Sequence, residues 1–413
     1  MNVVVIDADV SYPPTSGKRL RTLNLMLPLA KRHRITYLAR GDAHAAESRE
    51  AVEFLRGHGI EAVVVHDPVP RKKGAGFYLR LAGNLLSPLP YSVSSHVSEP
   101  MRRAAEGLAA RQRVGVWHVE VAPYLHAVRN VPGARTSLAA PNVESLIWQR
   151  YAEVEANPLK RWFCRSQWKK YERFERRAFA AATRVVAVSE DDAALVRGRF
   201  GVETVDVVDN GIDTSFFEHV KNCPEPGRVL FLGSLEWRPN LDAVRLLLDR
   251  VFPAVRAAGP GARLSIVGRR PPAWLAQRVR SEPAVELHAD VPDVRPHLAR
   301  ASVLAVPLRI GGGSRLKILE ALGCGVPVVS TRVGAEGLEL RDGEHLAVVE
   351  DVEQMAPALV HCLRNPAAAR ERAERGRRVV VARYDWWPLA DRLEQSWEKC
   401  LRPAGPALER QAV

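Results

Sequence analysis

The 413-residue sequence contains no cysteine pair with the spacing of a metal site or a redox centre. Its five cysteines are scattered and form no CxxC motif: Cys164, Cys223, Cys324, Cys362 and Cys400. An odd, dispersed set is typical of a reducing compartment and argues against a disulfide framework or a structural zinc site. No other spacing of His, Cys and Asp suggests metal ligands, so we expect no metal site.

Long hydrophobic runs are also missing. No segment approaches the roughly 20 consecutive apolar residues that a membrane-spanning helix requires. The first residues, 1–7, are apolar but have neither a basic region before them nor a small-residue cleavage site after them. We therefore interpret this segment as a buried strand, not a signal peptide, and expect a cytoplasmic protein.

Positive charge is in excess. The chain has 60 Lys and Arg residues against 47 Asp and Glu residues, which gives a formal net charge of +13. Basic residues concentrate in the first half, for example at 160–161, 169–170 and 173–177. Such a surface attracts anions such as nucleoside diphosphates or acidic lipid headgroups. An arginine-rich surface without a specific ligand is the alternative.

Five aromatic residues lie among the bases of one charged helical stretch, 144–182: Trp148, Trp162, Phe163, Trp168 and Phe174. Aromatic and basic residues mixed in this way are typical of a peripheral contact with an anionic membrane. We expect such a contact at the inner face of the cell membrane, and no nucleic-acid partner. Packing of these rings against the first sheet explains them equally well.

The length and the hydrophobic pattern predict two domains. Short β-branched runs alternate with amphipathic helical stretches, which is typical of parallel sheets with helical crossovers. We expect an α/β fold with two Rossmann-like, doubly wound domains facing a central cleft, where ligands of such folds bind. The predicted parts are a first domain at 1–208, a connection at 209–227, a second domain at 228–383, and a C-terminal helix with a frayed tail at 384–413 that crosses back to the first domain.

The individual elements follow from the same pattern. Strands are expected at 2–7, 34–40, 60–66, 114–119, 135–139 and 184–189 in the first domain and at 228–233, 262–267, 284–289, 302–306 and 326–330 in the second. Helices of the second domain are expected at 240–258, 272–281 and 313–324.

The strongest functional signal is a glycine loop between a strand and a helix of the second domain. The loop consists of four small residues: Gly311, Gly312, Gly313 and Ser314. Glycines let backbone N–H groups approach a phosphate, and a helix N-terminus adds its positive end. Arg315 and Lys317 stand in the first helical turn, where the helix dipole disfavours cations, so an anionic ligand would explain them. Glu320, about one turn further on, is placed to accept hydrogen bonds from a ribose diol.

Two other interpretations of this loop are weaker. A glycine turn followed by a solvated helix face would explain the composition but not the cations at the helix start. A dinucleotide-binding G-x-G-x-x-G motif would need a glycine where Leu316 stands.

Together with the glycine-loop segment 311–329, three further stretches resemble the retaining glycosyltransferases of family 4, which have the GT-B fold. Residues 209–217 (Asp-Asn-Gly-Ile-Asp-Thr-Ser-Phe-Phe) resemble the family's interdomain connection, 231–240 its first donor-domain strand and loop, and 264–268 a central strand. Each stretch is short, but their order and spacing span most of the chain. The motif is most similar to bacterial polysaccharide and exosortase-associated sugar transferases.

The resemblance implies an enzyme that transfers a hexose-type sugar from a nucleoside-diphosphate donor to a hydroxyl acceptor with retention. It implies a role in surface polysaccharide or glycoconjugate synthesis, a lipid-linked or other hydroxyl acceptor, and no cofactor or metal. The donor contacts that it implies, besides the glycine-loop helix, are Gly233, Ser234 and Asn240. Lys317 and Arg315 would stabilise the leaving diphosphate.

One departure from the family pattern concerns the sugar. Many members carry two glutamates eight positions apart, the first contacting the transferred sugar and the second the ribose. Counting back from Glu320 reaches Gly312, so the first glutamate is missing. The identity of the sugar therefore stays open.

The first domain has a second candidate phosphate loop at 12–21. Gly17 would allow close backbone approach to the donor diphosphate, and Lys18, Arg19 or Arg21 would supply a positive field. The segment is not a P-loop, because Tyr12 and Arg19 replace residues that a P-loop requires. A helix-entry turn with solvated bases is the alternative.

Other polar residues follow the strands of the first domain. His118 and Glu120 end the strand 114–119, and we predict a catalytic role for both beside the reacting sugar, although a lone histidine is often structural. Asn142 and Glu144 follow the next strand and are expected on the acceptor side. The Asp-Ala-Asp sequence at 7–9 is interpreted as a chance likeness to the metal motif of another glycosyltransferase fold.

Two other function classes stay open. A sugar-nucleotide epimerase shares the fold and would need no acceptor. A non-catalytic protein that binds anions or membranes would show salt-sensitive binding without sugar transfer. The combination of Arg315, Lys317 and Glu320 favours the transferase.

Overall fold

The structure, a computed structural model, describes residues 1–70, 73–312 and 315–402. The chain forms two compact units, each described here by itself. The first unit comprises Met1–Trp148, Trp162–Val208 and the C-terminal segment from Leu389 onward. The second comprises Gln149–Arg161 and Asp209–Pro388.

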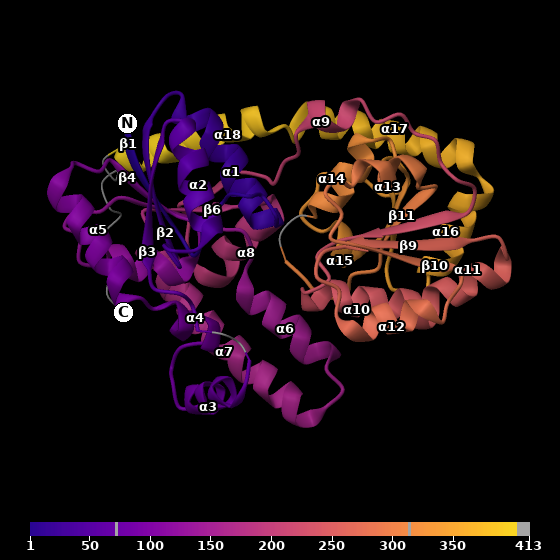
Figure 1. Cartoon of the computed structure of the whole chain (residues 1–413), viewed down its shortest axis with the longest axis horizontal. Coiled ribbons are helices and arrows are strands. Elements are labelled where there is room, and N and C mark those ends of the chain that lie inside the picture. The colour runs from indigo at the N-terminus through magenta and orange to yellow at the C-terminus, as the bar shows by residue number, and fades with distance from the viewer. Residues whose placement is uncertain (71–72, 313–314, 403–413) are drawn as a thin grey trace. The chain divides into compact units, whose positions relative to one another are not determined.

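The first unit is built on a seven-stranded parallel sheet with the strand order β3-β2-β1-β4-β5-β6-β7 (Figure 1). Its strands are β1 (Asn2–Asp7), β2 (Arg34–Gly41), β3 (Ile60–His66), β4 (Val116–Val119), β5 (Thr136–Ala140), β6 (Arg184–Ala187) and β7 (Val205–Val207). The order reverses between β1 and β4, where Val4 pairs with Thr36 on one side and Trp117 on the other. Ligands of doubly wound sheets bind at such a reversal, beyond the carboxyl ends of the strands.

Helices connect these strands. They are α1 (Gly17–Ala30), α2 (Ala46–Gly57), α3 (Ala75–Asn84), α4 (Tyr91–His96), α5 (Glu99–Arg111), the 3₁₀ helix η1 (Ala122–Val128), α6 (Glu144–Val154), α7 (Pro158–Ala181) and α8 (Glu190–Phe200). Local sequence explains several boundaries. The Ser189 hydroxyl caps α8 by accepting from the Asp192 backbone N–H, and Gly201 ends the helix with a left-handed φ of 69°.

The second unit has a six-stranded parallel sheet with the order β10-β9-β8-β11-β12-β13. Its strands are β8 (Arg228–Leu232), β9 (Arg263–Gly268), β10 (Val285–Ala289), β11 (Val303–Val306), β12 (Val328–Thr331) and β13 (Ala347–Val349). This order reverses between β8 and β11. The loops that follow these two strands therefore meet at the place where a doubly wound sheet holds its ligand.

The helices that follow β7 are α9 (Thr214–Glu218), α10 (Arg238–Leu246), the π-helical turn η2 (Leu247–Val251), α11 (Phe252–Ala258), α12 (Ala273–Arg280), α13 (Arg295–Arg300), α14 (Leu316–Gly323), α15 (Arg332–Ala335), α16 (Met355–Arg364), α17 (Pro366–Arg383) and α18 (Trp386–Leu401). Among the described residues, no helix is long and apolar enough to cross a membrane.

The cores explain why the strands were recognisable in the sequence. Val3, Val4, Val5 and Ile6 of β1 are all 0% exposed, because helices cover both faces of a parallel sheet and every side chain of a central strand is buried. The predicted α/β architecture with two doubly wound parallel sheets is confirmed.

Several local boundaries differ from the expectation. The predicted helix at 240–258 contains the π-helical turn at Leu247–Val251. The edge strands β7 and β13 were not predicted, since three residues are too few to show a hydrophobic period. Residues 149–161, predicted within the first domain, group with the second unit. The predicted frayed end beyond residue 402 lies outside the described residues.

The predicted connection and the C-terminal return segment contact each other. Ile212 forms an isolated parallel bridge with Asp385, and its backbone N–H donates to the Tyr384 carbonyl at 2.8 Å. The unit boundary falls between Val208 and Asp209, and a second boundary falls between Pro388 and Leu389. Helix α18 places Trp397 against His118 of the first unit, as described below.

Candidate functional site

The candidate donor site surrounds the start of α14. The Lys317 ammonium donates to Asn240 Oδ1 at 2.9 Å and lies 4.6 Å from the centre of the Phe231 ring. Asn240 is itself fixed, because its Nδ2 donates to the Ser234 carbonyl at 2.8 Å. Side chains from β8, α10 and α14 therefore converge on one lysine at the reversal point of the second sheet.

Gly233 is needed at this site for its lack of a side chain. A Cβ atom there would lie 2.7 Å from Lys317 Nζ and 2.8 Å from Asn240 Nδ2, which are closer than real Cβ contacts. Any larger residue would displace the ammonium or the amide. The predicted donor residues Gly233, Ser234, Asn240 and Lys317 are thus brought together by the fold.

The described part of the glycine loop has a similar constraint. Gly311 has a φ of 153°, and a Cβ on it would lie 2.2 Å from the Arg315 guanidinium. Arg315 is buried, 5% exposed, and donates to the Gly312 carbonyl. The loop conformation and the arginine thus require one another. Gly313 and Ser314 lie outside the described residues.

The electrostatics of α14 are unusual for a helix start. Burial and, to a smaller extent, the nearby charge of Arg315 lower the pKa of Lys317 to about 7, against the raising effect of Glu320. Burial also raises the pKa of Glu320 to about 7, against the lowering effect of Lys317. Both side chains are half-buried. The site holds a desolvated cation and a desolvated acid, a combination common at functional sites.

Glu320 has no hydrogen-bond partner among the described residues, and its interaction with Lys317 is electrostatic only. A carboxylate one turn into the helix, with free acceptor positions, is able to bind a pair of hydroxyl groups. This is the role that the resemblance implies, and it stays a prediction.

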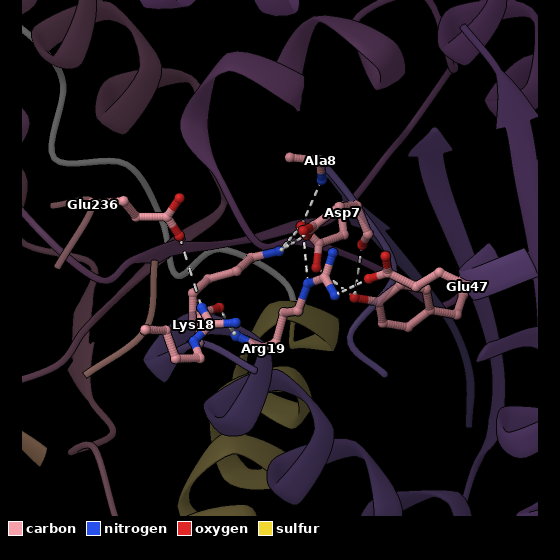
Figure 2. A network of polar contacts seen from close by, with 10 residues as sticks. Asp7, Ala8, Lys18, Arg19, Glu47 and Glu236 are labelled. Atoms are coloured by element: carbon pink, nitrogen blue, oxygen red, sulfur yellow. Dashed lines mark hydrogen bonds and ion pairs between the residues drawn. The ribbon is translucent and has the colours of Figure 1, made fainter. Parts of the chain in front are cut away.

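The candidate site of the first unit lies at the corresponding place, beyond β1 (Figure 2). Lys18 donates to Asp7, which is buried, and to Asp9 at 3.0 Å. Arg19 donates to Asp9 at 2.9 Å and to Glu47. The bases that the sequence suggested as a positive field are therefore paired with carboxylates of the same unit.

Charge pairing changes the titration of this cluster. Burial raises the pKa of Asp7 to about 6, although Lys18 acts to lower it. Burial acts to lower the pKa of Lys18, but Asp7, Asp9 and Glu120 outweigh it and hold the pKa above its usual range. Arg21 is 4% exposed and donates to the Val208 carbonyl at 2.8 Å, so it supports the sheet.

His118 lies inside the unit. Its Nδ1 accepts from the indole N–H of Trp397 at 3.2 Å and lies 3.1 Å from Ser137 Oγ, while its Nε2 lies 3.4 Å from Glu120 Oε1. The ring is 2% exposed. Since Nδ1 is an acceptor, the ring proton is on Nε2 and faces Glu120. Direct contact of this ring with a sugar would require these contacts to break, so the predicted catalytic role of His118 stays a prediction.

Glu120 is buried at the carboxyl end of β4, next to the Asp7 cluster. Burial acts to raise its pKa, but the hydrogen bond from His118 and the nearby charges of Lys18 and Arg21 outweigh it and hold the pKa below its usual range. The carboxylate is thus kept ionised at the reversal point of the first sheet. Its catalytic role is likewise a prediction.

Asn142 and Glu144 line a cavity of about 250 Å³ within the first unit, next to the carboxyl ends of β4 and β5. The remaining wall is mostly apolar and includes His96, Tyr171 and Phe174. Glu175 borders the cavity and accepts from the backbone N–H groups that begin α6, at 2.6 and 3.1 Å. Burial raises the pKa of Glu175 to about 8.

Sequence reasoning missed two features of these sites. The sequence interpretation of Asp7 and Asp9 as a chance likeness to a metal motif assigns them no role, whereas the structure shows both carboxylates as partners of Lys18. The Phe231 ring under Lys317 was not recognised, because a phenylalanine in a buried strand carries no special signal. Among the described residues, no three His, Cys, Asp or Glu side chains are grouped to hold a metal ion.

Family comparison agrees with the two-part architecture. Residues 17–216 match the model of Glycosyltransferase Family 4, and residues 226–365 match the model of Glycosyl transferases group 1. The two matches lie one after the other and together cover most of the chain.

Individual relatives are distant. Glycogen synthase of Mycobacterium tuberculosis is 28% identical over 201 residues, which are 46% of this chain and 47% of that protein. The GDP-mannose-dependent alpha-(1-6)-phosphatidylinositol monomannoside mannosyltransferase of Mycolicibacterium smegmatis is 31% identical over 163 residues, 36% of this chain and 43% of that protein. The chain spans about half the length of the curated relatives it matches.

The solved structures resemble the chain over its whole length. Sucrose-phosphate synthase from Thermosynechococcus elongatus superposes with a TM-score of 0.73 at 16% identity, covering 97% of this chain and 99% of that chain. At this identity the likeness concerns the fold. The two consecutive family matches, together with the two doubly wound sheets, show that the chain belongs to the family 4, group 1 glycosyltransferases and has the GT-B fold.

Proposed function

We propose that the protein transfers a sugar from a nucleoside-diphosphate donor to a hydroxyl group of an acceptor, with retention of the anomeric configuration. Family membership and the relatives' names support sugar transfer. Retention is proposed from the family resemblance alone. The anomeric configuration of the product, read by NMR, tests it.

The observation that carries the proposal is Lys317. Its ammonium is held by a neutral amide and an aromatic ring at the reversal point of the sheet, and burial brings its pKa to about 7. An anion would restore the charge that burial disfavours. A donor diphosphate at the start of α14 would meet Lys317, Arg315 and the helix N-terminus together.

In the proposed reaction, the bond between the anomeric carbon and the diphosphate oxygen breaks while the acceptor oxygen attacks from the same face. The acceptor proton passes to the leaving diphosphate. Negative charge develops on that diphosphate, so Lys317 and Arg315 stabilise the transition state more than the ground state. Glu320 would hold the ribose.

We propose that no metal or other cofactor takes part. Two cations and a helix N-terminus are available to neutralise the leaving diphosphate, which is the task that a divalent ion performs in other transferases. The donor is a substrate, and its base and sugar are to be identified by the screen described below.

We propose an acceptor with a hydroxyl group on a lipid-linked intermediate, in the synthesis of a bacterial surface polysaccharide or glycoconjugate. The cavity at Asn142 and Glu144 supports an acceptor with an apolar part, since most of its wall is apolar. The relative from Mycolicibacterium smegmatis is named as a mannosyltransferase that acts on a phosphatidylinositol monomannoside, which is a lipid. A cytoplasmic location with peripheral contact at an anionic membrane completes the proposal.

The first test is a thermal-shift screen of UDP-, GDP- and dTDP-sugars with the wild type. We expect one nucleotide class to stabilise the protein, and we expect Lys317→Ala and Glu320→Ala each to weaken the shift. Lys221→Ala and Glu218→Ala serve as matched controls, because both residues are exposed and lie outside the site.

Two outcomes would contradict the proposal. If no nucleotide sugar stabilises the folded wild type at millimolar concentration, the remaining interpretation is a non-catalytic protein that binds anions. Conversion of the donor alone into an epimer, followed by NMR without acceptor, would assign the site to an epimerase.

A further inference from the structure

We propose that helix α3 and the exposed basic face of α7 form one docking surface for an anionic lipid bilayer. We call this the α3–α7 surface, and define it by Tyr78, Leu79, Leu85 and Leu86 on the α3 side and by Trp162, Arg165, Lys169, Arg173 and Arg176 on α7. It deepens the proposed membrane contact by assigning it to particular residues, and it does not depend on sugar transfer.

The α3 side is unusually apolar for an exposed segment. Tyr78 is 67% exposed, Leu79 73%, Leu85 40% and Leu86 94%. Within α3 itself, only Asn84 is buried. Large apolar side chains gathered on one exposed segment indicate an interaction site, whereas single ones are ordinary.

The α7 side supplies the charge. Trp162 is 59% exposed, and after it exposed bases recur every three or four residues at 165, 169, 173 and 176, which places them on one face of the helix. Among the described residues, none of these four bases forms an ion pair with a carboxylate. Helix α5 differs from α7 in this respect, because its Arg102 forms ion pairs with Glu99 and Glu106 of the same helix.

Hydrogen bonds join the two helices into one surface. Lys170 of α7 donates to the Asn84 carbonyl at 2.7 Å, at the C-terminal end of α3, and Gln167 Nε2 of α7 donates to Asn84 Oδ1 at 3.4 Å. Both side chains are buried. Figure 1 shows α3 beside α7. The apolar segment is therefore held next to the basic face.

The chemistry of this surface matches a bilayer. Exposed leucines and aromatics insert at the headgroup boundary, and unpaired bases nearby attract acidic headgroups. A second copy of the chain would bring the same unpaired bases against each other and would be repelled. We therefore infer that the partner of this surface is an anionic bilayer.

The test is sedimentation of the whole protein with vesicles of phosphatidylcholine alone or with 30% phosphatidylglycerol. We expect binding to the anionic vesicles, weaker binding in 0.5 M salt, and little binding to neutral vesicles. Leu79→Ser with Leu86→Ser, and separately Arg165→Glu with Lys169→Glu, should each lower the partition coefficient on anionic vesicles by at least about tenfold.

Matched controls change the same chemistry elsewhere. Val381→Ser removes an apolar side chain that is 45% exposed, and Arg256→Glu with Arg280→Glu makes the same change of net charge on exposed residues of the second unit. We expect both controls to bind vesicles as the wild type does. Thermal midpoints and nucleotide-sugar stabilisation, measured for every variant, separate loss of docking from misfolding and from failure of the donor site.

Three results would overturn the inference. The wild type would sediment equally with neutral and anionic vesicles, or not at all. The variants of the α3–α7 surface would bind as well as the controls. The wild type would form a dimer in solution, and the double variant Leu79→Ser with Leu86→Ser would be monomeric. The apolar residues of the α3–α7 surface would then be an interface between two copies of the chain.

Discussion

Two lysines, one in each unit, lie in the first turn of a helix near the reversal point of their sheet and have opposite properties. Lys18 is the second residue of α1, after β1, and Lys317 is the second residue of α14, after β11. Lys18 has two carboxylate partners and a raised pKa, whereas Lys317 has a neutral amide partner and a pKa lowered to about 7.

The comparison separates a lysine that stabilises its own unit from a lysine that is available to bind a ligand. A lysine whose charge is already matched inside its own unit stabilises that unit, while a desolvated lysine without a carboxylate contact gains most from an anionic ligand. We therefore expect donor binding to depend more on Lys317 than on Lys18.

The largest expected effect is on catalysis. Lys317→Ala should lower kcat/KM by about 100- to 1,000-fold, since it removes a charge that stabilises the leaving diphosphate. Lys18→Met should lower kcat/KM much less. Initial rates with the donor found by the screen give kcat/KM for both variants. An equal loss of kcat/KM in the two variants would contradict the different roles proposed for the two lysines.

The next largest effect is on the stability of the unliganded protein, where we expect replacement of Lys18 to cost more than replacement of Lys317. Lys18→Met leaves Asp7 buried without its cation and should destabilise the unliganded protein by about 3 kcal/mol. Lys317→Met removes a desolvated charge and should be neutral or stabilising at pH 7. Thermal unfolding of both variants without ligand tests this, and a strongly destabilised Lys317→Met protein would show that the ammonium is structural.

Proton linkage sharpens the assignment of Lys317. A diphosphate raises the pKa of this lysine from about 7, so donor binding should take up about half a proton at pH 7 and nearly one at pH 8. Calorimetry in buffers of different ionisation enthalpy measures the uptake. The Glu320→Gln background is used because Glu320 titrates in the same range. Uptake that persists after Lys317→Ala would assign the proton to another group.

A smaller effect concerns Glu320 in the unliganded protein. Its pKa is about 7 when folded and 4.5 in the reference state, so the folded protein binds more protons between these values and this group lowers stability as pH rises from 4.5 to 7. Glu320→Gln removes the titrating group and with it this decrease in stability. The thermal midpoint of the variant relative to wild type should therefore rise by a few degrees between pH 5 and pH 8. A constant difference would contradict the raised pKa.

The smallest expected effect is that of metal removal. If Lys317 and Arg315 neutralise the diphosphate, EDTA dialysis should leave initial rates within about twofold, and added Mg²⁺ should not raise them. Rates that fall with EDTA and return with one divalent ion would show that the cations of α14 do not suffice.

The geometry of the candidate donor site was largely predictable because its signal is local. The loop glycines, Arg315, Lys317 and Glu320 lie in one short stretch, and the strand-loop-helix pattern places them at a helix start. The contacts of Lys317 with Asn240 and Phe231 were less accessible, since they join residues that are 77 or more positions apart.

The first unit shows the limit more clearly. His118 and Glu120 were correctly placed at the end of a strand, but the indole of Trp397, 279 residues away, and the neighbouring Ser137 determine how the His118 ring is oriented. Likewise, a short acidic motif at the end of β1 gave no indication that Lys18 would fold back onto it.

The two doubly wound sheets and the position of the candidate donor loop follow from the amino-acid sequence alone, because strand burial and helix starts depend on hydrophobic runs and on glycine placement along the chain. The pairing of Lys18 with two carboxylates and the neutral amide partner of Lys317 are visible only in the folded chain. This difference depends on desolvation and on charges brought together from distant segments, and neither quantity is defined until the chain has folded.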